Sequence, residues 1–414
     1  MLKDLLHRLE LAALFFSVAA AMAMWMVPMS IILQVHSLES IRTFAFSSFA
    51  IATFISPLFV GALSDRNISP VKAMRWNAIG AAISIFLVGV CIKTQMPRLL
   101  VLATIFIHAL FYAPAWGIAS TIVLTQLTDV PKQFGSIRAM ATIGWMAGCW
   151  IVSILCGDGS HTATFASAVG WLFVALLTKE LPLVEPPKTS APLKWYEQLG
   201  LDSLKLLKNR DHLMIYLTGT LFCIPVAAFY PFTPLHLRSL GLEHASGWMT
   251  LGQVSEVFAM FTLSWILSQI RIKWIIAAGL FFGVLRFLLC SWNTVLTVLG
   301  GIFLHGVSLT YVTITAQVYV DQRVNPGWRA RAQSLLTVMN SGVGNLTGYF
   351  FTSWWYSFCM YHSELGWHVF WLGIASFMVG AFIFFVLLYH GLGKGVKAIT
   401  PAKVSIEKVT TSVG

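Results

Sequence analysis

The sequence predicts an all-α integral membrane protein with twelve transmembrane helices. Hydrophobic residues make up 57% of the 414 residues and charged residues only 10%, against roughly 25% charged in soluble domains. The apolar runs are continuous rather than alternating, which favours helices over a β-barrel. Each run is long enough to cross ~30 Å of hydrocarbon. The expected spans are 11–33, 43–63, 74–94, 98–127, 136–156, 161–178, 212–235, 248–268, 274–292, 295–319, 332–355 and 367–389.

Basic residues are distributed unequally between the two sides of these spans. Of the 27 Lys and Arg residues, 21 fall on the side that holds both termini and the central linker, four fall on the other side, and two lie within spans. The positive-inside rule therefore predicts cytoplasmic termini. Since this asymmetry accounts for the net charge of +11, the charge indicates a lipid bilayer around the chain and no nucleic-acid partner.

A proline-rich polar stretch divides the spans into two sets of six. The expected parts are an N-terminal six-helix bundle (1–178), a cytoplasmic linker with an amphipathic helix (179–211), a C-terminal six-helix bundle (212–390) and a basic cytoplasmic tail (391–414). Two such halves are typical of secondary transporters, whose substrate site lies between the halves near mid-membrane.

A short charged motif follows the second span. Residues 61–66 read Gly-Ala-Leu-Ser-Asp-Arg, which resembles the G-x-x-x-D-R/K signature of the major facilitator superfamily. Gly61 would let two helices approach closely, and Asp65 would offer a carboxylate to a helix N-terminus or an arginine. With Arg66 these residues are expected to form a gate, the alternative being a solvated charged turn.

Span 5 presents three side chains capable of binding a flat polar ligand. Arg138, Thr142 and Trp145 share one helical face. The indole could stack on a ring, while the guanidinium and the hydroxyl could form hydrogen bonds. The alternative is that Arg138 extends to the cytoplasmic headgroups.

Glu256 in span 8 is the one acidic residue of 16 that falls inside a predicted span. A charge at this depth costs several kcal/mol unless it is paired or hydrated, which marks it as a functional candidate. Gln253 lies one turn earlier on the same face. Arg286 in span 9 lies at a similar depth, so the two charges are expected to pair and couple transport to protons, the alternative being a permanently ionised structural pair.

Polar residues of spans 7 and 10 complete the candidate site. Span 7 carries Tyr230 among prolines that should kink the helix near the cavity. Span 10 carries Thr310 and Tyr311 within a polar stripe. For His305 of the same span, packing with hydrogen bonds and proton relay both remain open.

Together these residues resemble the bacterial nucleoside:proton symporter family of the major facilitator superfamily. The resemblance rests on ordered pieces through most of the chain: Arg138/Thr142/Gly144, Leu199-Gly-Leu-Asp202, Gln253/Glu256, Leu285-Arg286-Phe287, His305-Gly306 and Arg329-Ala-Arg331-Ala-Gln333. It implies that the matching Arg, Thr, Gln and Glu line a nucleoside cavity and that carboxylates couple transport to protons. The family's span 10 usually carries an acid where this chain has Thr310. Glu256 then carries the proton alone, or Arg138 meets an anionic ligand, or transport is uncoupled.

The sequence thus predicts a secondary active transporter that brings a nucleoside and a proton into a bacterial cell across its inner membrane by alternating access, as a monomer. The alternatives are a major facilitator transporter of another small polar solute, such as a purine base, sugar or organic anion, and an uncoupled uniporter. A membrane enzyme would need an interfacial cluster of His, Asp or Cys. Without such a pattern in the sequence we expect no catalytic residues, no metal and no cofactor.

Overall fold

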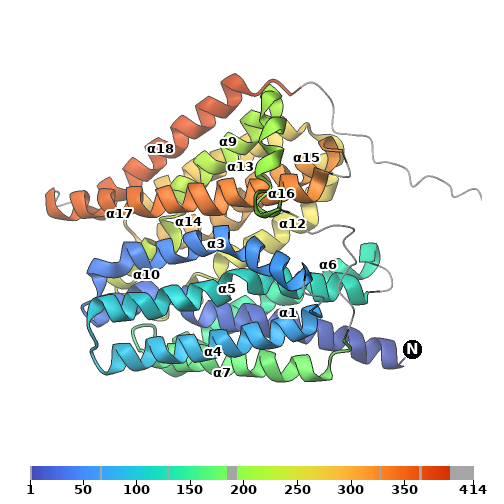
Figure 1. Cartoon of the computed structure of the whole chain (residues 1–414). Helices are drawn as coiled ribbons and strands as arrows, with labels where there is room; N and C mark the ends of the chain where they lie inside the picture. Colours follow the sequence, from blue (N-terminus) through green and yellow to red (C-terminus); the bar gives the residue numbers. More distant parts are fainter. Residues whose placement is uncertain are drawn as a thin grey trace, which may run out of the picture.

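The computed structural model describes residues 2–65, 68–127, 130–183, 194–325, 328–362 and 366–391. These residues form helices, which gather into two bundles that lie one above the other in Figure 1. The lower bundle contains α1 (Leu2–Met26), α2 (Met29–Val35), α3 (Arg42–Asp65), α4 (Pro70–Lys93), α5 (Arg98–Gln126), α6 (Val130–Ile151), the π-helical η2 (Val152–Cys156) and α7 (Thr162–Glu180).

The upper bundle begins after the linker. It contains α9 (Arg210–Val226), α10 (Phe229–Ser239), α11 (Ala245–Trp248), α12 (Leu251–Gln269), α13 (Ile272–Ser291), α14 (Val295–Leu309), α15 (Thr315–Arg323), α16 (Arg329–Thr337), α17 (Asn345–His362) and α18 (Gly366–Leu388). The π-helical segments η4 (Thr310–Ile314) and η6 (Val338–Gly344) join α14 to α15 and α16 to α17.

Ten stretches of the described chain are long and apolar enough to span a membrane, counting a broken helix as one stretch. They match ten of the predicted spans. The predicted spans 43–63 and 332–355 correspond to α3 and to the continuous helical stretch α16–η6–α17. The chain is therefore a multi-pass membrane protein with the all-helical fold that the sequence predicts.

The first helix of each bundle is broken. Helix α1 is separated from α2 at Val27–Pro28, and helix α9 is separated from α10 at Ala227–Ala228. Proline has no backbone N–H and its ring clashes with the carbonyl four residues earlier. Pro28 explains the first break, and Pro231, four residues after Ala227, explains the second.

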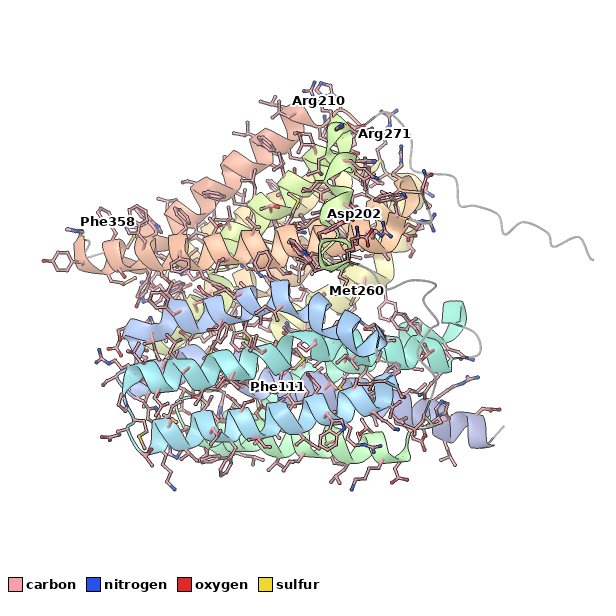
Figure 2. All side chains as sticks on the ribbon, viewed as in Figure 1. Phe111, Asp202, Arg210, Met260, Arg271 and Phe358 are labelled. Atoms are coloured by element: carbon pink, nitrogen blue, oxygen red, sulfur yellow. The ribbon has the colours of Figure 1, made fainter. Side chains whose placement is uncertain are left out.

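The labelled side chains of Figure 2 identify the two ends of the bundles. Asp202, Arg210 and Arg271 lie at one end, which we call the linker end, and Phe358 lies at the other, the far end (Figure 2). The N-terminus also lies at the linker end (Figure 1). This arrangement gives both bundles two common ends, between which positions on different helices can be compared.

In the linker (179–211), the structure has two short helical pieces where the sequence predicts one amphipathic helix. The two pieces are α8 (Trp195–Gln198) and the 3₁₀ helix η3 (Leu201–Lys208), separated at Gly200 with φ +71°. Gly200 lies against the Arg331 backbone, where a side chain would clash with the carbonyl. Arg331 also donates a hydrogen bond of 2.6 Å to the Asp202 carboxylate. These contacts attach the linker to the upper bundle.

The two bundles touch each other at the far end. Ser30 of α2 donates a hydrogen bond to the Pro231 carbonyl of α10. The Asp158 carboxylate accepts hydrogen bonds from Ser153 Oγ at 2.9 Å and from the Ser246 backbone N–H of α11 at 3.2 Å. Trp150 donates to Thr250 Oγ1 at 3.2 Å. The far end is therefore closed by neutral donors, one carboxylate and aromatic side chains.

Candidate functional site

A cavity of about 140 Å³, which we call cavity A, lies between the two bundles at α6 and α12. Its lining comprises Ala19, Trp116, Arg138, Ala141, Thr142, Trp145, Tyr230, Gln253 and Glu256. Six of the residues predicted to bind substrate are in this set. Three of them come from the lower bundle and three from the upper one.

Small residues of α6 explain how its polar face comes to point into cavity A. Gly144 and Gly148 lie one turn apart and press against the α1 backbone at Phe16 and Ala20, where added Cβ atoms would meet the carbonyl oxygens. Close helix approach at paired small residues is common in membranes. With this face fixed on α1, Trp145 on a neighbouring face lines the cavity.

Arg138 is held inside cavity A and does not extend to the headgroups. Its guanidinium carbon lies 4.2 Å from the centroid of the Trp116 ring, which is a favourable cation–π distance. Thr142 is 8% exposed and also lines the cavity. The lower bundle therefore presents one cation and one hydroxyl to a ligand.

Glu256 faces Arg138 from the other bundle. Glycines set its position, because Gly306 of α14 packs so closely on α12 that a Cβ would meet the Gly252 carbonyl and the Glu256 nitrogen. Glu256 and Arg138 line the same cavity and interact electrostatically. Among the described residues they form no direct ion pair, so space for a ligand or water remains between them.

Two polar atoms in cavity A are buried and have no hydrogen-bond partner. They are Nε1 of Trp145 and Oε1 of Gln253. A buried polar group without a partner costs about 1–3 kcal/mol, so a small rotation of either side chain toward a bound molecule would gain a hydrogen bond. The Trp145 ring lies 6.1 Å from the Tyr230 ring at an angle of 52°, and the two rings form an aromatic wall.

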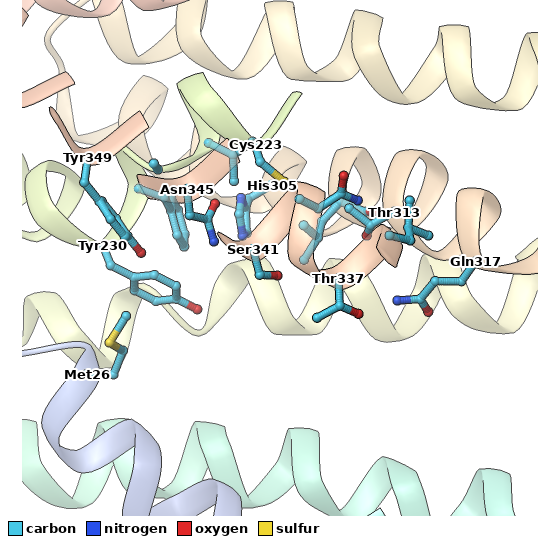
Figure 3. A pocket seen from close by; sticks show the side chains of 16 residues that line it. Met26, Cys223, Tyr230, His305, Thr313, Gln317, Thr337, Ser341, Asn345 and Tyr349 are labelled. Atoms are coloured by element: carbon cyan, nitrogen blue, oxygen red, sulfur yellow. Dashed lines mark hydrogen bonds between the residues drawn. The ribbon is translucent and has the colours of Figure 1, made fainter. Parts of the chain in front are cut away.

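A second, larger cavity, cavity B, adjoins cavity A at Tyr230. It has a volume of about 350 Å³ and is lined by helices of the upper bundle together with Met26. Figure 3 shows Tyr230 and Tyr349 at one end and Thr337 and Gln317 at the other. Because α15 ends and α16 begins at the linker end, cavity B runs from mid-membrane toward that end.

The predicted pairing of Glu256 with Arg286 is wrong. Arg286 is 2% exposed and donates a hydrogen bond from Nη1 to Nδ1 of His305. Its guanidinium also lies over the Phe287 ring, 4.2 Å from the centroid. Similar depth on successive helices did not bring the two side chains together, because Arg286 of α13 turns toward α14.

Thr310 and Tyr311 line neither cavity. Thr310 is fully buried, and its hydroxyl has no partner among the described residues. Tyr311 packs against Gly279 and lies 6.4 Å from the Phe282 ring on α13. Both residues stand in the π-helical η4. A π-turn holds more residues than an α-turn, so it rotates the following face relative to a regular helix.

The predicted gate lies outside what the structure describes. Arg66 is not among the described residues, and the side chains of Gly61 and Asp65, at the end of α3, are not described either. The role of this motif stays a prediction.

Several polar residues of cavity B are not among the predicted site residues. Asn340 and Asn345 lie in and after η6, and Tyr349 follows on α17. In cavity A, Trp116, which supports Arg138, was not predicted either. Two asparagines within a predicted span were the available signal, because amides are seldom placed in lipid without a partner.

Two bundles of membrane-spanning helices, closed against each other at one end and enclosing polar cavities at mid-depth, define a secondary transporter. A solved carrier has a similar shape. The crystal structure of a mutant of the nucleoside transporter NupG superposes with a TM-score of 0.84 at 23% identity, covering 92% of this chain and 99% of that one. The fold is the major facilitator fold.

The sequence places the chain within one family of such carriers. Residues 7–391 match the model of the family described as "Nucleoside H+ symporter", and the chain belongs to this family. It is 29% identical to the putative nucleoside transporter YegT of Escherichia coli K12, over 78% of this chain and 79% of that protein. It is 28% identical to the nucleoside permease NupG of the same strain, over 73% and 76%. The predicted family and transport function are thereby confirmed.

Proposed function

We propose that this nucleoside:proton symporter moves its two substrates into the cell across the bacterial cytoplasmic membrane, with both termini in the cytoplasm. Residues 1–178 and 212–390 are the two moving units, and they alternately expose the site to either side. The observation that supports this is cavity A, whose polar lining comes from both units. A ligand held there touches both halves of a single chain, so we propose that the monomer is the working unit.

The charges of the two cavities favour an uncharged polar solute. The lining of cavity A holds one arginine and one glutamate, and the lining of cavity B holds no Asp, Glu, Lys or Arg. A nucleoside matches this balance, whereas an organic anion would have to compete with Glu256 for Arg138. We assign the base to the aromatic wall of Trp145 and Tyr230. Thr142 and Gln253 would form its hydrogen bonds.

Glu256 is the group we propose to carry the proton. When it is ionised, it attracts Arg138 across the boundary between the moving units. Protonation removes this attraction and so changes the free energy that holds the units together at cavity A. A ligand shifts a conformational equilibrium only through such a difference between states, which makes the pair a physical link between proton binding and alternation. Asp65, with Gly61 and Arg66, remains our candidate for the gate at the linker end.

The test is uptake of radiolabelled uridine by the full chain in proteoliposomes. Glu256→Gln keeps the shape of the side chain but cannot titrate, so we expect it to lose accumulation under an inward proton gradient while retaining uridine exchange. The matched control is Glu180→Gln, an exposed acid at the end of α7, which should behave like the parent. Accumulation by Glu256→Gln equal to that of the parent would show that another group carries the proton.

A panel of unlabelled competitors separates the candidate solutes. Nucleosides should compete with labelled uridine, whereas free bases, sugars and organic anions should not. Competition by one of those classes, with none by nucleosides, would assign the chain to a different substrate.

A further inference from the structure

Cavities A and B together, and not cavity A alone, have the size of a binding site. Pockets that enclose small molecules usually measure about 300–1,000 Å³. Cavity A, at about 140 Å³, is below this range, and cavity B adds about 350 Å³ beyond Tyr230. A nucleoside with one ring system against Trp145 must therefore extend past Tyr230. The side chains of cavity B nearest this junction become candidate contacts.

His305 lines cavity B and packs on Phe229, the residue before Tyr230, and its ring is held in place on three sides. Its ring stacks on Phe229, with 3.7 Å between centroids and 10° between planes. Its Cδ2 edge faces Gly252, 3.3 Å from where a Cβ would stand. Arg286 donates to its Nδ1. The ring therefore has a fixed position and a fixed orientation.

The bond from Arg286 also fixes where the imidazole proton sits. Arginine has five donors and no acceptor, so Nδ1 of His305 must be the unprotonated nitrogen. In a neutral imidazole the remaining nitrogen, Nε2, then carries the hydrogen. The pair thus converts a residue that could donate or accept into one that presents a donor only.

This donor is available to a ligand. Nε2 of His305 has no hydrogen-bond partner among the described residues, and it is also not one of the fully buried atoms that lack a partner. Since His305 lines cavity B, we infer that this nitrogen faces the space of that cavity. Cavity B therefore offers an unused donor at His305.

We propose that His305 is a substrate-contacting residue that donates a hydrogen bond from Nε2 to an acceptor oxygen of the nucleoside, and that Arg286 is the positioning residue that fixes this donor. The inference rests on the proposed nucleoside site and extends it into cavity B. It gives Arg286 a role in recognition in place of a pairing with Glu256. The acceptor is either a carbonyl of the base or a hydroxyl of the sugar.

The experiment measures equilibrium binding of uridine and its analogues to the purified full chain. His305→Phe keeps the stacked ring and removes the donor, and His305→Gln keeps an N–H close to the position of Nε2. The matched control is His108→Phe, which replaces another buried intramembrane histidine. His108 contacts Ser84 and the Ala81 carbonyl and lines neither cavity. Analogues lacking the 2′-, 3′- or 5′-hydroxyl, or one base carbonyl, identify the acceptor.

Loss of one hydrogen bond should raise the Kd of His305→Phe for uridine about 2- to 12-fold. The analogue that lacks the oxygen accepting from Nε2 should bind the parent and His305→Phe with equal Kd. His305→Gln should stay within about threefold of the parent, and His108→Phe should match the parent. The analogue that equalises the two proteins also distinguishes the base carbonyl from the sugar hydroxyl.

Three results would overturn the inference. His305→Phe could bind uridine as tightly as the parent, or it could weaken every analogue by the same factor, which is what a purely structural role would do. If His305→Phe does not fold, the result with His305→Gln decides. Binding by His305→Gln that is weakened more than tenfold, and equally for every analogue, would count against the proposal. Failure of the parent to bind any nucleoside would instead refute the proposed function, and this inference with it.

Discussion

Trp145 offers the sharpest test of where the base binds. Its ring lies beside the Tyr230 ring in the lining of cavity A, and its Nε1 is buried without a partner. Stacking on an aromatic side chain is worth ~1–3 kcal/mol per base in proteins that bind single-stranded nucleic acids. Trp145→Ala should therefore raise the Kd for uridine by about 5- to 150-fold. Trp145→Phe keeps a ring and loses one donor, so it should raise the Kd by about 2- to 12-fold.

The order in which the two variants weaken uridine binding is as informative as the size of the two effects. Uridine binding to the purified protein should weaken from parent to Trp145→Phe to Trp145→Ala, with no change in the thermal unfolding midpoint large enough to indicate misfolding. The control is Trp76→Ala on α4, which removes an indole that is 69% exposed and should leave the Kd unchanged. Equal affinity of Trp145→Ala and the parent would remove Trp145 from the site and with it the aromatic wall.

Two further predictions concern the fold and the topology. Gly144→Ala should destabilise the protein by about 1–3 kcal/mol, because its methyl group would press on the Phe16 backbone. The control is Gly117→Ala, because Gly117 is a helical glycine with no atoms near its Cβ position; this substitution should be neutral or stabilising. Thermal unfolding in detergent compares the two variants. Equal shifts of the unfolding midpoint would contradict the close packing of Gly144 on α1. Reporter fusions after Lys408 and within residues 188–194 should both read cytoplasmic, and an external signal from either would reverse the proposed orientation.

The fold could be predicted from the sequence because a membrane reduces the number of possible structures. Only helices or closed barrels satisfy the backbone in lipid, so length and apolarity nearly determine the helices. The candidate residues on α6 and α12 could also be predicted, since a spacing of three or four residues fixes a shared face on a regular helix. Arg138, Thr142 and Trp145 accordingly line the same cavity.

Depth along a helix did not determine which way a side chain points around it. Glu256 and Arg286 were matched by depth, but Arg286 turns to His305. Thr310 was placed by assuming a regular helix, and the π-helical η4 breaks that regularity. A carboxylate introduced at position 310 would thus be buried without reaching Arg138. The countercharge sought there is instead Glu256, on a helix of the same bundle. Cavity B was missed because neutral amides such as Asn340 carry no charge to single them out.

The paired breaks in the first helix of each bundle have a consequence for how the far end opens. The short pieces α2 and α10 lie beyond the breaks, and Ser30 joins them to each other through the Pro231 carbonyl. At each break the regular ladder of backbone hydrogen bonds is interrupted, so these pieces can bend without unwinding α1 or α9. We expect a thin gate made of α2 and α10 that moves in addition to the rotation of whole bundles. Such a gate permits an occluded intermediate, in which the substrate is shut off from both solutions before the larger rearrangement begins.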